Sequence, residues 1–248
     1  MAKNIIEVIN LKRNFIVGSE TVHALRGVSF SISAGEFVTI MGTSGSGKST
    51  LLNLLGCLDT PSEGDYKLDG ISIKQMNKDE RAMLRNRKIG FVFQSYNLLP
   101  KTTAVENVEL PLIYNNEVSA RERKRKAIES LKAVGLADRL YHKSNQMSGG
   151  QQQRVAIARA LVNEPVIVLA DEATGNLDTR TSFEILSLFQ ELNQKEGRTI
   201  IFVTHNPELA SFSSRNIVLR DGLVLEDTAN NNIASAYEAL QKLPKLDD

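Results

Sequence analysis

The sequence has almost no cysteine and almost no net charge. Cys57 is the only cysteine among 248 residues, so an intramolecular disulfide is impossible, which suits a reducing cytosol. We interpret Cys57, which lies among leucines, as a core residue. Lys and Arg total 30 against 29 Asp and Glu, which leaves a formal charge of +1. This balance gives no reason to expect broad nucleic-acid binding or a polybasic membrane anchor.

Long apolar runs are also missing. No run approaches the ~20 residues that cross a bilayer, and Met1 to Asn4 lead directly into a strand pattern without a signal-peptide core. We therefore expect a soluble cytoplasmic protein, for which any membrane role requires another polypeptide. The length is sufficient to bury a substantial core and suits one domain with a lobe.

A glycine-rich loop lies between an apolar run and a leucine-rich segment. Gly42 to Ser49 fits the pattern G-x-x-x-x-G-K-[ST], in which backbone N–H groups turn inward around a phosphate at a helix N-terminus. Lys48 is expected to reach the β- and γ-phosphates, and the Ser49 hydroxyl is expected to bind Mg²⁺. The predicted phosphate-binding residues are Gly42, Thr43, Ser44, Gly45, Ser46, Gly47, Lys48, Ser49 and Thr50.

The pattern of apolar segments predicts an α/β fold with an antiparallel portion. Closely spaced strands with tight turns near the N-terminus are typical of antiparallel sheets, and the later alternation of strands and helices indicates a parallel sheet. The expected strands are Ile5 to Leu11, Phe15 to Val17, Val28 to Ile32, Phe37 to Met41, a hairpin from Tyr66 to Ile73, Ile89 to Phe93, Val166 to Ala170, Thr199 to Val203, and a hairpin from Ile217 to Leu225. The expected helices are Leu51 to Leu58, Asn77 to Arg87, Gln152 to Leu161, Thr179 to Lys195, and a terminal helix within Ile233 to Leu243.

A helical lobe is predicted between strands of this core. From Thr103 to about Gly135 the pattern is helical, with Ser119 and Glu122 at capping-box spacing and Gly135 suited to a helix end. We expect a single domain over residues 1–248, with the core and the antiparallel β lobe at about 1–94 and 160–227 and the helical lobe at about 95–159. The tail at 228–248 carries no assigned chemistry.

Two carboxylates follow an apolar strand. Asp171 and Glu172 come directly after Val166 to Ala170. In nucleoside-triphosphatases with a glycine-rich loop, an acid at the end of a neighbouring strand holds Mg²⁺. Asp171 is the candidate for that role, and Glu172 is the candidate base for the attacking water.

A second glycine-containing loop precedes another helix. Ser148-Gly149-Gly150-Gln151 leaves backbone N–H groups free at a helix start, where a second anion can approach. One nucleotide cannot easily use both loops of the same chain if they lie on separate lobes. The economical arrangement is two chains facing head to tail, with each γ-phosphate between the Lys48 loop of one and the Ser148 loop of the other.

In the order of these motifs, from about Ile5 to about Asp227, the chain resembles the nucleotide-binding subunits of ATP-binding-cassette (ABC) transporters. The resemblance implies a RecA-like parallel-sheet core with an antiparallel β subdomain and an inserted helical subdomain. It also implies ATP and Mg²⁺ as cofactors and a head-to-tail homodimer. A membrane permease is the further partner implied, with the chain on the inner face of the cell membrane.

Several site residues are assigned only through this resemblance. Phe15 matches the aromatic residue that stacks on adenine, and Val22 is counted with it among the nucleotide-binding residues. Gln94 matches the glutamine that contacts Mg²⁺ and the water, and His205 matches the histidine that senses the γ-phosphate. The motif matches also include the family signature and the loop that crosses the dimer; these residues are Ser148, Gly149, Gly150, Gln151 and Asp178.

Three positions depart from the commonest family pattern. Met147 replaces a leucine, Phe15 replaces a tyrosine, and Ala173 replaces the proline after the catalytic glutamate. Met and Leu are similar in volume, and an adenine stack needs only a ring face, so neither change threatens function. The Ala173 substitution puts the rigidity of the loop after Glu172 in doubt.

The finer resemblance is to lipoprotein-release, macrolide-export and cell-division ATPases. It is carried by Phe93 to Pro100, Glu106 to Leu112 and Ala170 to Asp178. This branch implies a permease with a large extracytoplasmic domain and export or extraction of lipoprotein, peptide or drug. An alternative is a regulatory module that transmits ATP state through its permease without cargo. DNA-repair and translation ATPases share the signature but need a long coiled coil or two cassettes, which are not present.

Overall fold

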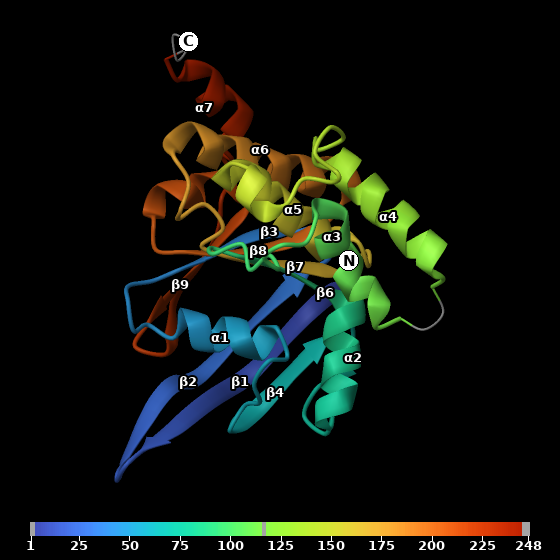
Figure 1. Cartoon of the computed structure of the whole chain (residues 1–248). Helices are drawn as coiled ribbons and strands as arrows, with labels where there is room; N and C mark the ends of the chain where they lie inside the picture. The colour runs from blue at the N-terminus through green and yellow to red at the C-terminus, as the bar shows by residue number, and fades with distance from the viewer. Residues whose placement is uncertain (1–2, 116–117, 245–248) are drawn as a thin grey trace.

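The computed structural model describes residues 3–115 and 118–244, which form two sheets and the helices around them (Figure 1). The larger sheet has the strand order β10-β9-β3-β8-β7-β6, with β9, β3, β8, β7 and β6 parallel and β10 antiparallel to β9. Its strands are β3 (Phe37–Met41), β6 (Ile89–Phe93), β7 (Ile167–Asp171), β8 (Thr199–Thr204), β9 (Arg215–Arg220) and β10 (Leu223–Ala229). The predicted parallel sheet is therefore confirmed.

The smaller sheet is antiparallel, in the order β2-β1-β4-β5. Its strands are β1 (Asn4–Val17), β2 (Glu20–Ser33), β4 (Glu63–Leu68) and β5 (Ile71–Ser72). The sequence predicts separate strands at Ile5 to Leu11 and Phe15 to Val17, which is wrong because both lie in β1. Register shifts between Val8 and Asn14 interrupt the alternation of buried side chains without ending the ladder, so the pattern resembles two strands.

The helix after the glycine-rich loop begins and ends three residues earlier than the predicted Leu51 to Leu58. It spans α1 (Lys48–Leu55), and Gly56 caps it through an N–H bond to the carbonyl of Leu52. Cys57 follows in a left-handed conformation with φ 54°, so it lies beyond the helix, although it is buried as expected. Burial raises the pKa of its thiol to about 11, so the thiol is protonated at neutral pH.

The other helices begin at the capping residues that their sequences indicate. The α2 helix has a full capping box of Asn77 and Glu80, α3 has one of Thr103 and Glu106, and Ser119 accepts from the backbone of Glu122 at the start of α4. These helices span α2 (Lys78–Lys88), α3 (Ala104–Ile113) and α4 (Ala120–Ala133). The later helices are α5 (Gly149–Leu161), α6 (Thr179–Glu196) and α7 (Ala236–Lys242), with 3₁₀ turns η1 (Ser144–Gln146) and η2 (Pro207–Phe212). The terminal helix is shorter than Ile233 to Leu243.

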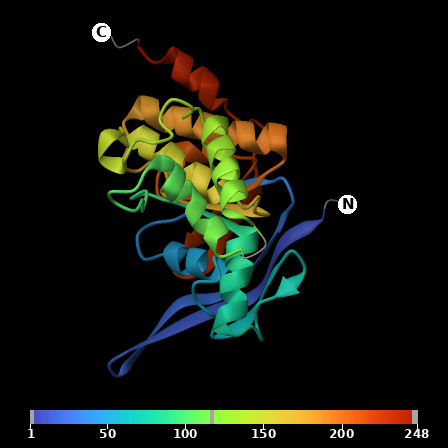
Figure 2. The ribbon, with the colours of Figure 1, turned by 45° about the vertical axis from the view of Figure 1, so that its right-hand side comes forward.

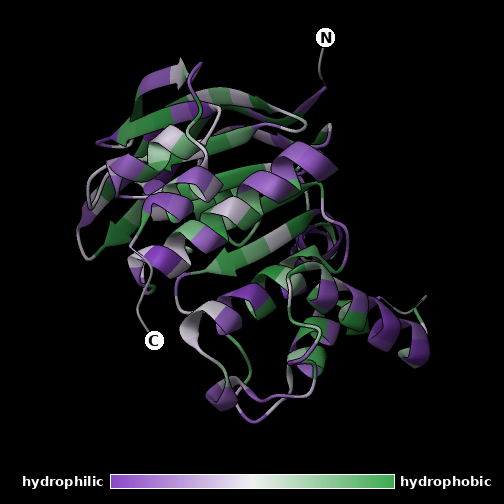
Figure 3. Ribbon diagram, turned by 90° about the horizontal axis from the view of Figure 1, so that it is seen from above, coloured by the Kyte–Doolittle hydropathy of each residue, from purple (hydrophilic) through white to green (hydrophobic). Residues whose placement is uncertain are grey.

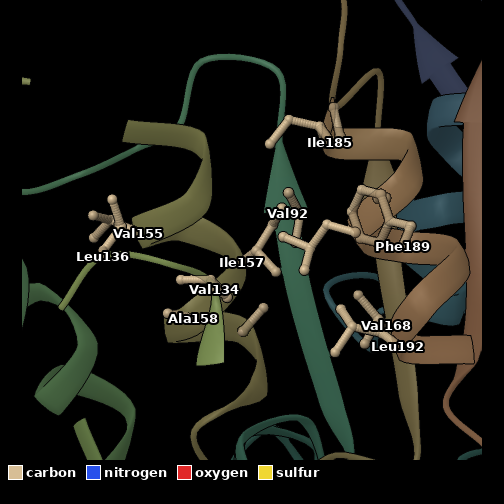
Figure 4. Packing of buried hydrophobic residues seen from close by; sticks show 14 of the residues in the cluster. Val92, Val134, Leu136, Val155, Ile157, Ala158, Val168, Ile185, Phe189 and Leu192 are labelled. Atoms are coloured by element: carbon tan, nitrogen blue, oxygen red, sulfur yellow. The ribbon is translucent and has the colours of Figure 1, made fainter. Parts of the chain in front are cut away.

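The parallel sheet separates two hydrophobic cores. Alternate residues of its strands face opposite sides: Val168 packs with α5 and α6, whereas Leu169 packs with α1 and the antiparallel sheet. Figure 4 shows Val92 of β6 between Ile157 of α5 and Phe189 of α6. In Figure 3 the strands carry long hydrophobic stretches while the helices alternate along their length, as expected for a sheet that is covered on both faces.

The two ends of the molecule are formed by different parts of the chain. The β1–β2 hairpin projects from one end, and α7 lies at the other, packed against α6 (Figures 1 and 2). The tail beyond Pro244 lies outside the described residues. Within the described part of the chain, none of the helices has the length and apolar character of a membrane span.

A buried asparagine organises the loop that connects β6 to the helical lobe. The Oδ1 atom of Asn107 accepts from the backbone N–H of Leu99 at 2.7 Å. Its Nδ2 donates to Oγ1 of Thr102 at 2.7 Å and to the carbonyl of Thr103 at 3.0 Å. Asn107 is fully buried, so these bonds replace water and hold the loop on α3.

We expect Asn107→Ala to lower the free energy of unfolding by about 2 kcal/mol, because the N–H of Leu99 loses its acceptor and the hydrogen bonds of the buried Asn107 amide are lost. Urea denaturation with an unchanged slope would measure this loss. Asn231→Ala, at an exposed position, is the matched control and should leave the midpoint in place. Equal midpoints for the two variants would contradict the role of Asn107.

Candidate functional site

The conformation of the glycine-rich loop depends on its glycines, through positive φ angles and through close contacts with neighbouring backbone. Gly45 and Gly47 have φ of 80° and 101°, a region that residues with a Cβ rarely adopt. A methyl group added at Gly42 would lie 2.3 Å from the carbonyl oxygen of Leu219, and one at Gly47 would lie 2.7 Å from that of Ala24. The loop therefore packs directly against β2 and β9.

Lys48 holds the loop in its wound shape. Its Nζ donates to the carbonyls of Gly42 at 2.7 Å and Thr43 at 2.9 Å, and the residue is only 9% exposed. The hydroxyl of Ser46 is buried and has no hydrogen-bond partner in this structure. A nearly buried ammonium held only by neutral carbonyls favours an anion as an additional partner.

A cavity of about 950 Å³ opens over this loop. Predicted residues that line it are Val22, Gly42, Thr43, Ser44, Gly45, Gly47, Lys48, Ser49, Thr50, Glu172 and His205. The candidate phosphate loop and the candidate catalytic pair thus share one cavity, although they come from distant parts of the sequence. Phe15, which is 37% exposed, is outside the lining but is the cross-strand neighbour of Val22.

Sequence reasoning missed part of the lining. His23, which the sequence analysis assigns no role, lines the cavity together with Ala24, Met41, Pro207 and Val218. The Nδ1 atom of His23 lies 2.8 Å from Oδ1 of Asn14. The sequence does place His23 directly after Val22, a predicted nucleotide-binding residue. Its place at the cavity, however, depends on the pairing of β1 with β2, which no motif reveals.

Glu172 and His205 form a pair at the ends of two neighbouring strands. Nδ1 of His205 lies 2.7 Å from Oε1 of Glu172, and since a carboxylate oxygen accepts at this distance, Nδ1 carries the proton. Glu172 has φ 46°, which is unusual for a residue with a Cβ, and its N–H donates to the carbonyl of Val203 at 2.9 Å. The strained turn places the Glu172 side chain, which is 26% exposed, at the cavity beside His205.

The loop after Glu172 is held even without a proline. Ala173 is 1% exposed, and its carbonyl accepts from Nε2 of the buried Gln153 at 2.6 Å. The N–H of Gly175 donates to the carbonyl of Glu172 at 2.8 Å. Packing and hydrogen bonds from α5 therefore supply the rigidity that the alanine puts in doubt.

The remaining predicted residues lie away from the cavity lining. Gln94 and Asn176 form a reciprocal pair, in which Gln94 Nε2 donates to Asn176 Oδ1 at 3.2 Å and Asn176 Nδ2 donates to the Gln94 carbonyl at 3.1 Å. Ser148 and Gln151 cap the start of α5 with each other, and Asp178 caps α6 through Thr181. Neither Gly149 nor Gly150 lines the cavity, so the Ser148 loop and the Lys48 loop of one chain do not meet in it.

The residues present fit a hydrated Mg²⁺ bound together with phosphates. Mg²⁺ prefers oxygen ligands and usually takes one or two protein groups, with water and phosphate oxygens completing the shell. Ser49 and Asp171 would supply these groups, with Gln94 the third predicted ligand. Across residues 3–115 and 118–244 there is no cluster of three or more His, Cys, Asp or Glu able to hold a metal.

The surroundings of Asp171 disfavour its ionised form. Burial raises the pKa of this carboxyl, the neighbouring Glu172 raises it further, and Lys48 opposes the rise. A carboxyl whose pKa is higher folded than unfolded destabilises the folded state as pH rises above the unfolded pKa, and the effect is complete above the folded pKa. A cation bound beside Asp171 would stabilise the ionised form of its carboxyl.

We therefore expect Asp171→Asn to raise the free energy of unfolding of the nucleotide-free protein at pH 7. The gain should shrink as pH falls toward 3.8, the ordinary aspartate pKa, because the carboxyl then becomes neutral in both states. Thermal unfolding of both proteins between pH 4 and 7.5 measures it. Asp138→Asn, at a side chain that is 70% exposed, is the control, and a less stable Asp171→Asn at pH 7 would contradict the expectation.

Comparison with known proteins places this geometry in a family. An uncharacterized ABC transporter ATP-binding protein of Thermotoga maritima is 55% identical over 222 residues, covering 90% of this chain and 94% of that protein. The macrolide export ATP-binding/permease protein MacB of Syntrophobacter fumaroxidans is 51% identical over 222 residues, covering 89% of this chain but only 31% of that protein. The chain thus spans about a third of the length of that MacB protein.

Solved structures agree. The cassette MJ0796, a protein of Methanocaldococcus jannaschii, in a dimeric post-hydrolysis state with ADP and Pi, matches with a TM-score of 0.83 and 47% identity, covering 91% of this chain and 99% of that one. The family model described as ABC transporter matches residues 25–175, more than half of the chain. The resemblance inferred from the motifs is confirmed: the chain belongs to the ABC transporter family, as an ATP-binding subunit that hydrolyses ATP with Mg²⁺.

Proposed function

We propose that this ATPase closes as a head-to-tail homodimer on two MgATP molecules and drives a membrane permease from the cytoplasmic face of the membrane. The observation that carries the proposal is the shared cavity, in which the Gly42 to Thr50 loop lies opposite Glu172 and His205. This arrangement brings together a site for a triphosphate and a carboxylate able to act on water.

Each residue at this cavity has a distinct task in hydrolysis. The Lys48 ammonium exchanges its two carbonyl partners for phosphate oxygens, and the loop N–H groups stabilise charge on the transferring phosphoryl group. Glu172 orients the attacking water and accepts its proton, while the hydrogen bond to His205 fixes the carboxylate. Mg²⁺, when bound with the nucleotide through Ser49 and Asp171, neutralises phosphate charge.

The second copy completes the site in this proposal. Ser148 to Gln151 start α5 outside the cavity of their own chain. Ser148 and Gln151 use their own N–H groups in the capping box, so the N–H groups of Gly149 and Gly150 are the ones proposed to reach the nucleotide of a partner. Asp178, which starts α6, is proposed to cross between the two copies. The MJ0796 cassette is described as dimeric in two solved structures, with 47% and 48% identity to this chain, which supports the same assembly here.

A second cavity is proposed to receive the permease. It has a volume of about 860 Å³ and lies between α2, β6, α3 and α5. Its rim includes Met83, which is 55% exposed, and Tyr114, which is 80% exposed, while the stacked rings of Phe91 and Phe93 form its floor. The MacB relatives are named ATP-binding/permease proteins, which supports a permease as the occupant of this groove.

The charge of this groove indicates what docks there. Arg85, Arg87 and Arg159 line it, no Asp or Glu belongs to its lining, and within the described residues none of the three guanidinium groups has a carboxylate within 4.0 Å. Arg159 instead donates to the carbonyls of Tyr96 and Asn97. An apolar permease segment that carries a carboxylate fits this surface.

The class of cargo is proposed from the resemblance to lipoprotein-release and macrolide-export ATPases. Relatives that carry the name macrolide export support export or extraction of lipoprotein, peptide or drug through a permease with a large extracytoplasmic domain. The alternative is a regulatory module that moves its permease without cargo. Reconstituted vesicles that contain both proteins separate the two: ATP-dependent movement of cargo supports transport, and activation of an outer partner without movement supports the module.

We expect Glu172→Gln to reduce ATP turnover by at least ~10²-fold while leaving ATP affinity nearly unchanged, because the amide cannot accept the proton of water. The trapped ATP should then accumulate a dimer that size-exclusion chromatography detects. Glu191→Gln, at a side chain that is 53% exposed on α6, is the matched control and should retain full activity and remain monomeric after turnover. Hydrolysis by Glu172→Gln at the parent rate would remove Glu172 from its role.

Met83→Glu tests the docking groove. The new carboxylate lies on the rim of an apolar groove and repels an acidic permease segment, so we expect at least ~10-fold weaker association with the permease. The ATPase activity of the isolated chain should not change. Leu225→Glu, at a comparably exposed position on β10, is the control. Loss of association with Leu225→Glu but not with Met83→Glu would place the dock elsewhere.

A further inference from the structure

The proposed adenine site has an ion-paired arginine over its aromatic ring. The guanidinium carbon of Arg13 lies 4.6 Å from the ring centroid of Phe15. Nε of this guanidinium donates to Oδ2 of Asp59 at 2.8 Å, and the two side chains are only 23% and 27% exposed. Although the β1–β2 register shifts between Arg13 and Asn14, the contact of the guanidinium with the ring shows that the side chains of Arg13 and Phe15 project from the same face of β1.

Asp59 gives the guanidinium a fixed position. Its Oδ1 accepts from the N–H of Thr60 at 2.7 Å, while Oδ2 holds Arg13. The same loop holds β1 twice more: the N–H of Ser62 donates to the carbonyl of Lys12 at 2.8 Å, and Oγ of Ser62 accepts from the N–H of Asn14 at 3.0 Å. This loop follows α1, which starts at Lys48, so the guanidinium and the phosphate loop are anchored at opposite ends of one helix.

The ring needs such an anchor because it is a phenylalanine. It has no hydroxyl through which a hydrogen bond could set its orientation, and it is 37% exposed. The guanidinium covers one face of the ring, so a base can stack only on the other. We infer that Arg13, held by Asp59, is a positioning residue for base binding, which fixes the ring plane of Phe15 and leaves one face for adenine.

This inference rests on the proposed ATP site, and the two are tested separately. Arg13→Met should weaken the affinity for ATP by about two- to fivefold, the range of an exposed cation–π contact. The affinity for inorganic tripolyphosphate, which has no base to stack, should not change. KM for ATP should rise by the same factor while kcat at saturating ATP stays constant. Asp59→Asn, which releases the guanidinium, should shift the ATP affinity in the same direction.

Two further comparisons decide the outcome. Lys12→Met removes a neighbouring ion pair of β1, with Glu63 at 2.7 Å, and should leave both affinities unchanged. In a Phe15→Ala background, Arg13→Met should cause no further loss of ATP affinity. An equal loss for tripolyphosphate, or an undiminished loss without Phe15, would overturn the inference. If Phe15→Ala leaves the ratio of the affinities for ATP and tripolyphosphate unchanged, the inference fails. If this variant still hydrolyses ATP, the proposed function stands.

Discussion

The hydrogen bonds from Lys48 to the carbonyls of Gly42 and Thr43 are the interaction on which the site depends. They hold the loop wound in this structure, so in the proposed binding step phosphate oxygens replace two carbonyls and a free chain does not have to be ordered. The winding is possible only because glycines occupy positions where a Cβ would overlap the neighbouring backbone. The loop is thus a preformed anion site, and its conformation depends on how closely β2 and β9 approach it.

The parallel sheet brings this loop next to the proposed catalytic residues. The strands β3, β7 and β8 run in the same direction, so their carboxyl ends lie at one edge of the sheet. This edge carries the glycine loop, the Asp171 and Glu172 carboxylates, and His205. Ligands of open α/β sheets bind at this edge for the same geometric reason. Two buried cores, one on each face, keep the strands in register and so keep the distances at the edge constant.

The motifs allowed most of the core and its candidate site to be predicted, because each motif depends on local backbone requirements. Glycines with left-handed φ, capping pairs at a spacing of three and apolar runs ending in carboxylates are local features. What was missed depends on pairing across the chain. The register shifts in β1 make one strand resemble two in the sequence. His23 lies at the cavity because β2 pairs with β1, and the Arg13 ion pair joins residues 46 positions apart.

The proposed docking groove is connected to the loop that carries Asp178. Phe93 forms part of the groove floor, and the next residue, Gln94, exchanges two hydrogen bonds with Asn176, two positions before Asp178. A methyl group added at Gly175 would lie 2.6 Å from Nε2 of Gln94, so this amide pair occupies space that only a glycine leaves open. A displacement of β6 by a docked segment therefore has to move the Asp178 loop or break the amide pair. The two hydrogen bonds between Gln94 and Asn176 are thus the contact through which the groove and the Asp178 loop would influence each other.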